Sequence, residues 1–198
     1  QVEVLQVLRP VGTSLAGQSC NVAVVIDWSK YLQHFDLFPN DKRARVEPGV
    51  ICDMVRNAAN VHDLTYGPDP ATHDHCTFGG MIGNNSCGAH SLMSGKTAEN
   101  TEELDVLLYD GTRLRVGPTS DQDLSDTIER GGRAGEIYRR LRDVRDRYAE
   151  EIRARYPQIP RRVSGYNLDA LLPENGFNVA QALVGSESTC VVVLEAKC

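Results

Sequence analysis

The 198-residue sequence lacks any apolar run that approaches the roughly 20 residues a helix needs to cross a bilayer. It also lacks the basic excess typical of nucleic-acid-binding proteins, because 21 Lys and Arg face 27 Asp and Glu, for a net charge of −6. Proteins that neutralise phosphate backbones have the opposite balance. We therefore expect no transmembrane segment and no nucleic-acid partner.

Closely spaced cysteines are absent as well. No C-x-x-C pair occurs, and the six cysteines are spread along the chain at positions 20, 52, 76, 87, 190 and 198. This spacing favours free thiols in a reducing compartment over a disulfide framework. We accordingly expect a cytoplasmic protein, with a peripheral position at the inner face of the membrane as the alternative.

Two loops are rich in glycine, proline and small polar residues. The first, RPVGTSLAGQS at 9–19, has neither the Gly-Lys-Ser/Thr of a Walker loop nor the G-x-G-x-x-G of a dinucleotide-binding turn. Its successive backbone N–H groups and two hydroxyls can still hold a diphosphate. The second loop, at 67–88, combines stiffening prolines with glycines that allow close backbone approach. An ordinary rigid turn is the alternative for each loop alone, but together they favour a ligand-binding domain.

The hydrophobic pattern predicts a mixed α+β fold. Continuous apolar runs predict buried strands, and apolar residues at helical spacing predict helices. The expected strands are 2–8, 21–27, 45–47 (a short edge strand), 104–109, 112–116 and 190–196, and the expected helices are 50–59, about 121–130, 134–155 and 178–183.

Two local signals refine this prediction. Asp110-Gly111 between two apolar segments predicts a hairpin with a type I′ turn, in which both central residues have positive φ. Two N-cap pairings compete at the start of the helix near 121, namely Thr119 with Gln122 and Ser120 with Asp123.

Three segments resemble those of flavin oxidoreductases of the vanillyl-alcohol oxidase type. RPVGTSLAGQS resembles their pyrophosphate loop, usually Arg-Gly-x-Gly-Thr-Ser, and PDPATHDHCTFGGMIGNNSCG resembles their second flavin-binding segment. VGSESTCVVVLEA resembles the closing segment, commonly Gly-Ser-Glu-Gly-Thr before a strand, and RRVSGYNLDALLPENGFN also matches. The similarity is best to the branch that contains D-lactate dehydrogenase and the flavoprotein component of glycolate oxidase, in the large bacterial form joined to an iron–sulfur domain.

The resemblance implies a PCMH-type FAD-binding domain with an α+β fold in two subdomains. Residues 1–103 would form a small β-α subdomain with the diphosphate loop and a linker. Residues 104–198 would form an antiparallel sheet flanked by helices, with FAD between the two parts. Since the strand at 2–8 is apolar on both faces with nothing before it to pair with, we expect a partial domain, truncated at its N-terminus.

As for activity, the resemblance implies an FAD-linked oxidoreductase acting on CH–OH groups. A 2-hydroxy acid such as D-lactate, glycolate or D-2-hydroxyglutarate would lose a hydride to flavin N5, and the electrons would pass to an acceptor or an iron–sulfur domain. Substrate-binding groups and the catalytic base would come from a following cap domain, so His90 and Tyr166 are expected to be structural. The rival hypothesis is a non-catalytic or degenerate flavin-binding scaffold.

The resemblance also assigns the cofactor contacts. Residues 9–15 would hold the diphosphate, 68 and 76–77 would lie along the flavin, 84–87 would contact its ring and ribityl side, and the closing strand would reach the flavin or adenosine. The expected cofactor-binding residues are Arg9, Pro10, Val11, Gly12, Thr13, Ser14, Leu15, Pro68, Cys76, Thr77, Gly80, Asn84, Asn85, Ser86, Cys87, Gly88, Glu187, Thr189, Val191 and Val192.

Two residues depart from the family pattern. Pro10 stands where the family has glycine and removes one N–H from the diphosphate nest. Ser188 stands in place of the glycine before Thr189, where a positive φ would cost about 1 kcal/mol. We predict a weaker grip on the diphosphate than in typical relatives, and an unchanged FAD affinity in a Pro10→Gly variant would contradict this.

Two alternatives concern metal and covalent chemistry. A metal cluster would use imidazole and thiolate ligands, but His-x-His-Cys is not a standard structural spacing, so we expect no metal. Cys76 lies near where some family members attach flavin covalently, yet the first loop has no histidine for a companion bond, so we expect noncovalent FAD. The metal candidates are His73, His75, Cys76, Cys87 and His90.

Overall fold

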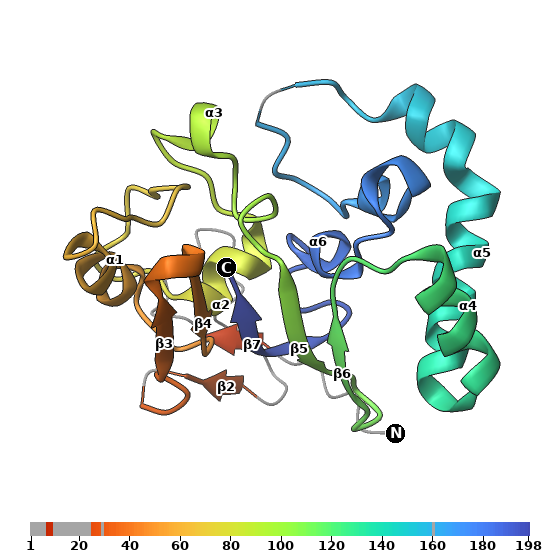
Figure 1. Ribbon diagram of the computed structural model, residues 1–198, viewed down its shortest axis with the longest axis horizontal. Helices are drawn as coiled ribbons and strands as arrows, with labels where there is room; N and C mark the ends of the chain where they lie inside the picture. The colour runs from red at the N-terminus through yellow and green to blue at the C-terminus, as the bar shows by residue number, and fades with distance from the viewer. Residues whose placement is uncertain (1–6, 10–24, 29, 160) are drawn as a thin grey trace.

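The computed structural model describes residues 7–9, 25–28, 30–159 and 161–198. A five-stranded antiparallel sheet in the order β3-β4-β7-β5-β6 forms its centre (Figure 1). A separate pair of parallel strands, β1 and β2, lies beside it. The strands are β1 Val7–Arg9, β2 Val25–Asp27, β3 Phe35–Phe38, β4 Arg43–Val46, β5 Glu103–Leu107, β6 Arg113–Val116 and β7 Val192–Lys197.

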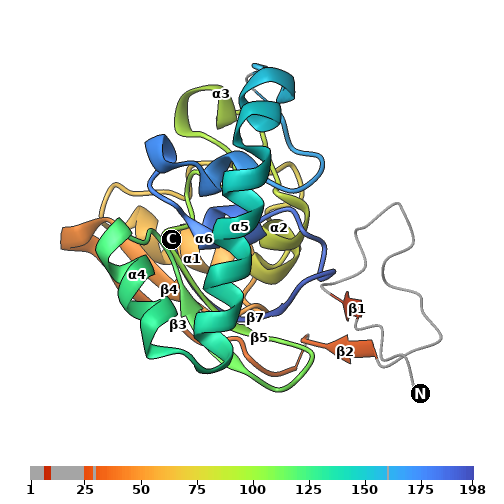
Figure 2. The same cartoon turned by 90° about the vertical axis from the view of Figure 1, so that its right-hand side faces the viewer.

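Helices cover the sheet and its two ends. Helix α1 packs at the β3 end, while α4 and α5 contact each other at the β6 end (Figure 2). The α-helices are α1 Cys52–Asn60, α2 Phe78–Asn84, α3 Ser91–Ser94, α4 Asp121–Arg130, α5 Gly132–Arg155 and α6 Val179–Leu183, and the 3-10 helices are η1 Pro39–Asp41, η2 Leu168–Leu171 and η3 Pro173–Asn175.

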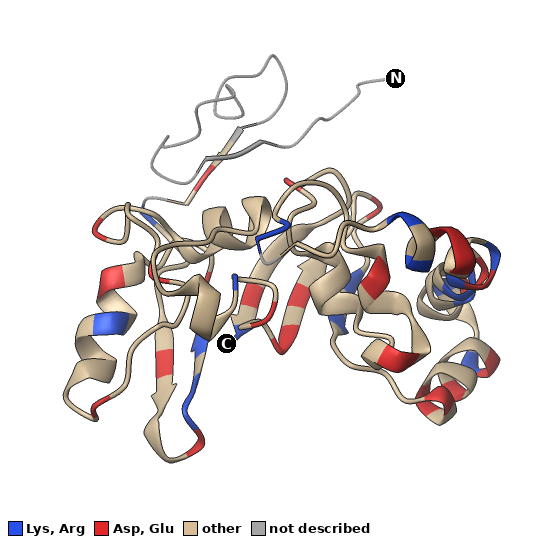
Figure 3. Cartoon of the chain, turned by 90° about the horizontal axis from the view of Figure 1, so that it is seen from above, with Lys and Arg blue, Asp and Glu red and all other residues tan. Residues whose placement is uncertain are grey.

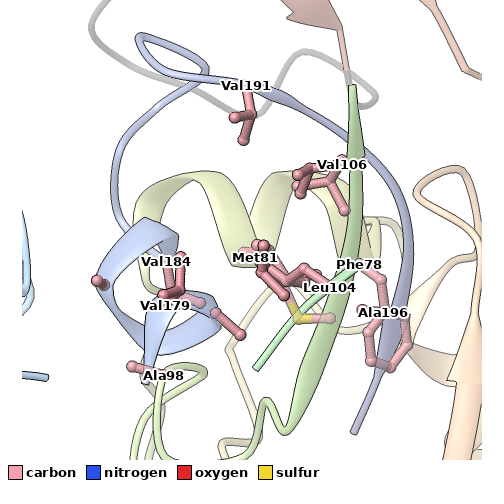
Figure 4. Close-up of a cluster of buried hydrophobic side chains, with 14 of the residues drawn as sticks. Phe78, Met81, Ala98, Leu104, Val106, Val179, Val184, Val191 and Ala196 are labelled. Atoms are coloured by element: carbon pink, nitrogen blue, oxygen red, sulfur yellow. The ribbon is translucent and has the colours of Figure 1, made fainter. Parts of the chain in front are cut away.

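The core lies between the central sheet and helices α2 and α6. Phe78 and Met81 of α2 meet Leu104 and Val106 of β5, with Val184 at the end of α6 beside them (Figure 4). All five side chains are at most 1% exposed. Burying side chains of this size contributes about 1.5 to 3 kcal/mol each, so this cluster fixes α2 on the sheet.

The helix predictions at 50–59, 134–155 and 178–183 are confirmed by α1, α5 and α6. Of the two N-cap pairings considered for α4, Ser120 with Asp123 is the one that forms, because the Ser120 hydroxyl accepts a hydrogen bond from the Asp123 N–H at 3.1 Å. Charges of both signs are interspersed along α5 (Figure 3), with ion pairs such as Glu136–Arg140 and Glu151–Arg155.

The hairpin at Asp110-Gly111 forms, but the prediction of a type I′ turn was wrong. Only Gly111 has a positive φ, +85°, whereas type I′ requires it at both central residues. The Asp110 carboxylate accepts a hydrogen bond from the Thr112 N–H at 2.9 Å, which favours an ordinary negative φ at residue 110.

The strand near 45–47 was wrongly predicted to lie at a sheet edge. β4 has β3 on one side and β7 on the other. Its inward Ala44 and Val46 are buried, and Arg45 between them pairs with Glu195 of β7 at 2.6 Å. The partner strand is 150 residues away in sequence, beyond the reach of a local pattern.

The largest correction concerns residues 67–88, which were predicted to be a rigid loop throughout. Their second half contains α2. Thr77 caps this helix, and Phe78, Met81 and Ile82 recur at helical spacing on its buried face. Gly79 lowers the helical propensity of this segment, so the sequence did not predict the helix. The glycine is needed for packing, because a Cβ there would come within 2.7 Å of the Pro48 Cβ.

The central sheet contains strands from both sides of residue 103, since β4 pairs with β3 on one side and with the later β7 on the other. The division into subdomains 1–103 and 104–198 stays a prediction. Within the described part of the chain, no helix is both long and apolar enough to span a bilayer.

Candidate cofactor-binding site

The C-terminal end of α2 meets the turn that follows α6. The Gly185 N–H donates to the Ile82 carbonyl at 2.8 Å, and the Glu187 N–H donates to the Gly83 carbonyl at 2.9 Å. These two bonds satisfy carbonyls that the end of a helix leaves without an internal partner. They also join the second and third segments predicted to bind the cofactor, although about a hundred residues separate them.

Asn85 fixes the chain as it leaves α2. It is fully buried and adopts the left-handed conformation with φ +53°. Its side-chain oxygen accepts a hydrogen bond from the Ala98 N–H at 3.0 Å. Its amide nitrogen has no hydrogen-bond partner among the described residues. A buried unsatisfied donor is costly, so this amide is available to a ligand acceptor.

Residues 86–88 are held equally firmly. The Ser86 carbonyl accepts from both the N–H and the hydroxyl of Thr97, at 3.0 and 2.8 Å. The Gly88 N–H donates to the Ser91 hydroxyl at 2.9 Å, and that hydroxyl donates to the Pro68 carbonyl at 3.1 Å. A Cβ on residue 88 would come within 1.7 Å of the Asp69 carbonyl oxygen, so only glycine fits there.

The turn 186–190 has its own support. The Tyr166 hydroxyl and the Thr189 Oγ1 lie 2.8 Å apart, and Thr189 donates to the Ser186 carbonyl at 2.6 Å. The Tyr109 hydroxyl donates to the Ser188 carbonyl. Ser188 has φ +62°, which confirms the positive φ expected where the family has glycine.

The predicted cofactor-binding residues differ in their exposure to solvent. Among those that are described, Asn84, Glu187 and Thr189 are exposed, and Gly80, Ser86, Cys87 and Gly88 are half-buried. The buried ones are Pro68, Cys76, Thr77, Asn85, Val191 and Val192. Of these, Cys76 and Val191 belong to the hydrophobic core, and Figure 4 shows Val191.

Thr77 and Cys76 serve the fold. The Thr77 hydroxyl accepts a hydrogen bond from the Gly80 N–H at 3.3 Å as the N-cap of α2. Cys76 is 6% exposed, and a hydrogen bond from the Cys52 thiol lowers its pKa to about 7 against the opposing effect of burial. Nearby Thr72 and the charges of two histidines lower the pKa further.

The first loop falls largely outside the described residues, and this includes Pro10, Val11, Gly12, Thr13, Ser14 and Leu15. Arg9 ends β1, and β1 contacts α2 (Figure 2). The described chain therefore reaches the start of this loop close to the helix that carries residues 83–84.

The histidines of the metal hypothesis each face an aspartate. His73 lies 2.8 Å from Asp53, and His90 lies 3.1 Å from Asp69. His75 pairs with its neighbour Asp74. Across the described ranges, no three His, Cys, Asp or Glu side chains gather in an arrangement that could hold a metal ion.

These residues fit a flat, polar cofactor. An exposed turn and a half-buried glycine-asparagine segment lie against each other on a rigid core, and the buried Asn85 amide has no partner within the part of the chain that the structure describes. The fold is that of PCMH-type FAD-binding proteins. It is similar to the solved structure of 6-hydroxy-D-nicotine oxidase from Arthrobacter nicotinovorans, with a TM-score of 0.59 over 98% of this chain and 30% of that chain at 14% identity.

The sequence matches the FAD binding domain family over residues 4–117, which is more than half of the chain. The chain belongs to this family, and FAD is the cofactor that family and fold assign to it. The expected α+β class is thereby confirmed.

Curated relatives extend the similarity. D-2-hydroxyglutarate dehydrogenase from Pseudomonas putida (strain KT2440) is 34% identical over 96% of this chain, which covers 19% of that protein. Glycolate oxidase subunit GlcD from Escherichia coli (strain K12) is 34% identical over 56% of the chain and 23% of its own length. The chain thus spans about a fifth of the length of these relatives.

Some residues that support the candidate site were not predicted from the sequence. Ser91 and Thr97 hold residues 86–88, and Tyr109 holds the turn at Ser188. A serine or threonine with no periodic role carries no distinctive signal. Tyr166 was expected to be structural, and its hydrogen bond with Thr189 brings it to the edge of the candidate site.

Proposed function

We propose that this chain is the FAD-binding portion of a flavin-dependent oxidoreductase that oxidises a 2-hydroxy acid such as D-2-hydroxyglutarate, glycolate or D-lactate. The observation that carries the proposal is the pairing of the C-terminal end of α2 with the turn 185–188, in which the Gly185 and Glu187 N–H groups donate to the Ile82 and Gly83 carbonyls. The activities for which the relatives are named support the substrate class. Bound FAD would supply the two-electron acceptor.

The described residues would hold and orient the cofactor. Asn84 and Ser86 are already hydrogen-bonded to each other at 2.6 Å, so their polar atoms are ordered before the flavin arrives. Ordering a site in advance lowers the entropic cost of binding. The amide of Asn85 would donate to a flavin acceptor, and Thr189, held by Tyr166, would approach from the opposite segment.

The diphosphate would lie on the first loop, with Gly12, Thr13 and Ser14 as donors. FAD would be bound noncovalently, because the Cys76 sulfur is buried and engaged by the Cys52 thiol. Yellow colour that survives denaturation and desalting would contradict noncovalent binding.

Substrate groups and the catalytic base would come from a cap domain, and electrons would pass to a separate acceptor or an iron–sulfur domain. We propose a cytoplasmic protein, with a peripheral position at the inner face of the membrane as the alternative. None of the described residues is assigned a catalytic role.

The test adds D-2-hydroxyglutarate, glycolate or D-lactate separately to the complete protein in the absence of oxygen. Reduction of the bound flavin is measured by its absorbance. Bleaching by one of the D-2-hydroxy acids or by glycolate is the expected result. Bound flavin that none of the three reduces would favour the second candidate, a non-catalytic scaffold. The strained φ of +62° at Ser188 is the observation behind that candidate.

A further inference from the structure

Cys52 and Cys76 face each other where α1 and α2 begin. An isolated antiparallel bridge joins Ile51 to Thr77, and the Cys52 N–H donates to the Cys76 carbonyl at 2.9 Å. The two cysteines are thus the next opposed pair beyond the bridge. Residues opposed in this way have Cα atoms about 5.5 Å apart, inside the range that a disulfide spans.

The two thiols also influence each other's protonation. Cys52 lowers the pKa of Cys76, and Cys76 raises the pKa of Cys52, so the negative charge is favoured on the Cys76 sulfur. Both side chains are buried, at 0% and 6% exposed, so a small oxidant has better access than a bulky reagent.

The surroundings favour a thiolate on Cys76. The hydrogen bond from Cys52 lowers the pKa of Cys76 to about 7, assisted by Thr72 and by the charges of His75 and His73. The hydrogen bond to Cys76, burial and the neighbouring thiolate raise the pKa of Cys52, and from α1 Arg56 opposes that rise while Asp53 adds to it. One nucleophilic thiolate beside one protonated thiol is the arrangement of a reactive dithiol.

We propose that Cys52 and Cys76 form an oxidisable dithiol, which a hydroperoxide converts into an intrachain disulfide between the starts of α1 and α2. The Cys76 thiolate attacks a peroxide oxygen, the O–O bond breaks, and an alcohol (water for hydrogen peroxide) leaves after protonation. The Cys52 sulfur then attacks the Cys76 sulfenic acid, and water leaves with the hydroxyl group and the thiol proton. Two thiols lose two electrons and two protons, and the peroxide is reduced.

The disulfide would tie α2 at its capped end. Thr77, the N-cap, follows Cys76 directly, and the other end of the same helix carries residues 83–84 of the candidate site. The proposal does not depend on the proposed function, because it rests on the Cys52–Cys76 contact and on neither FAD nor substrate.

The test treats the reduced complete protein with hydrogen peroxide, blocks remaining thiols with iodoacetamide, and maps disulfides by mass spectrometry without reduction. The expected product is a cross-linked peptide pair containing Cys52 and Cys76, reversed by dithiothreitol. Its rate of formation should rise as the pH increases through about 7, where Cys76 loses its proton. Mapping uses the unmodified sequence, so the result does not depend on a variant's folding.

The exposed Cys190 provides the matched control. Cys190→Ser should leave the cross-link unchanged, whereas Cys52→Ser should abolish it and leave a Cys76 sulfenic acid that dimedone traps. Alkylation of both Cys52 and Cys76 after a treatment that fully oxidises Cys190 would overturn the proposal. So would a disulfide that joins Cys76 to any cysteine other than Cys52.

Discussion

Gly88 packs so tightly on Asp69 that a Cβ on residue 88 would lie 1.7 Å from the Asp69 carbonyl oxygen. Asp69 cannot retreat easily, because its carboxylate is bound by Arg56 at 3.0 Å and His90 at 3.1 Å. The contact therefore holds the proline-rich turn against the end of the glycine-asparagine segment.

Gly88→Ala should destabilise the protein by about 2 kcal/mol or more, since the backbone must move to admit the methyl group. Chemical denaturation measures the change in the free energy of unfolding. Gly83→Ala is the matched control: no described atom lies within 4 Å of its added Cβ, so stability should stay equal or rise by up to about 1 kcal/mol. Equal stability of the two variants would contradict the packing account.

Asn85→Ala should cost about 2 to 3 kcal/mol. The substitution leaves the Ala98 N–H without its acceptor and places alanine in the left-handed conformation. Asn84→Ala, at the exposed neighbouring position, should change the free energy of unfolding by less than about 0.5 kcal/mol. A small effect at residue 85 would show that the Ala98 bond does not hold the segment.

Ser188→Gly should stabilise the protein by about 0.5 to 1 kcal/mol. It removes the cost of φ +62° at a residue with a Cβ, partly offset by the greater freedom of glycine in the unfolded chain. Thr189→Gly, where φ is not positive, should destabilise instead. Thermal unfolding of both variants measures the difference, and a destabilised Ser188→Gly would refute the strain.

The contribution of Asp105 should depend on pH. Hydrogen bonds from Arg113, at 2.9 and 2.6 Å, lower the pKa of this buried carboxyl below its usual value. A lowered folded-state pKa stabilises the protein fully above the unfolded value of about 4, and this stabilisation is lost as the pH falls through the folded value.

The stability difference between the unmodified protein and Asp105→Asn should therefore be constant from pH 5 to 7 and shrink below pH about 4. Urea unfolding at several pH values measures it. Asp36→Asn, at an exposed carboxyl on β3, serves as the comparison. A difference that grows toward acidic pH would have the wrong sign for this account.

The sequence predicted the long helix α5 well, because its signal is local, and the signals behind the predicted cofactor-binding segments are local too. Apolar residues recur along α5, and the glycines of residues 79–88 mark close backbone approach. Helix α2 was not predicted, because its glycines lower helical propensity, and only the close approach of Gly79 to Pro48 in the structure shows why residue 79 is glycine.

Pairings between strands that lie far apart in the sequence could not be predicted from local patterns. β3 was not predicted, and β4 was placed at an edge, because its partner β7 comes about 150 residues later. The support of Ser86 by Thr97 and of Ser188 by Tyr109 likewise depends on tertiary contacts between residues with unremarkable local patterns. The segments predicted to bind the cofactor stand out because proline fixes φ, while glycine and asparagine allow backbone conformations that other residues rarely adopt.

The most direct test of the flavin site is whether bound FAD protects Cys87 from alkylation. Cys87 is half-buried between Ser86 and Gly88, in the segment proposed to contact the flavin ring. N-ethylmaleimide labelling of the complete protein, quantified by mass spectrometry, should slow about tenfold or more at Cys87 under saturating FAD, while ADP, which lacks the ring, should leave the rate unchanged. Equal labelling rates with and without bound FAD would contradict the placement of the flavin on residues 83–88.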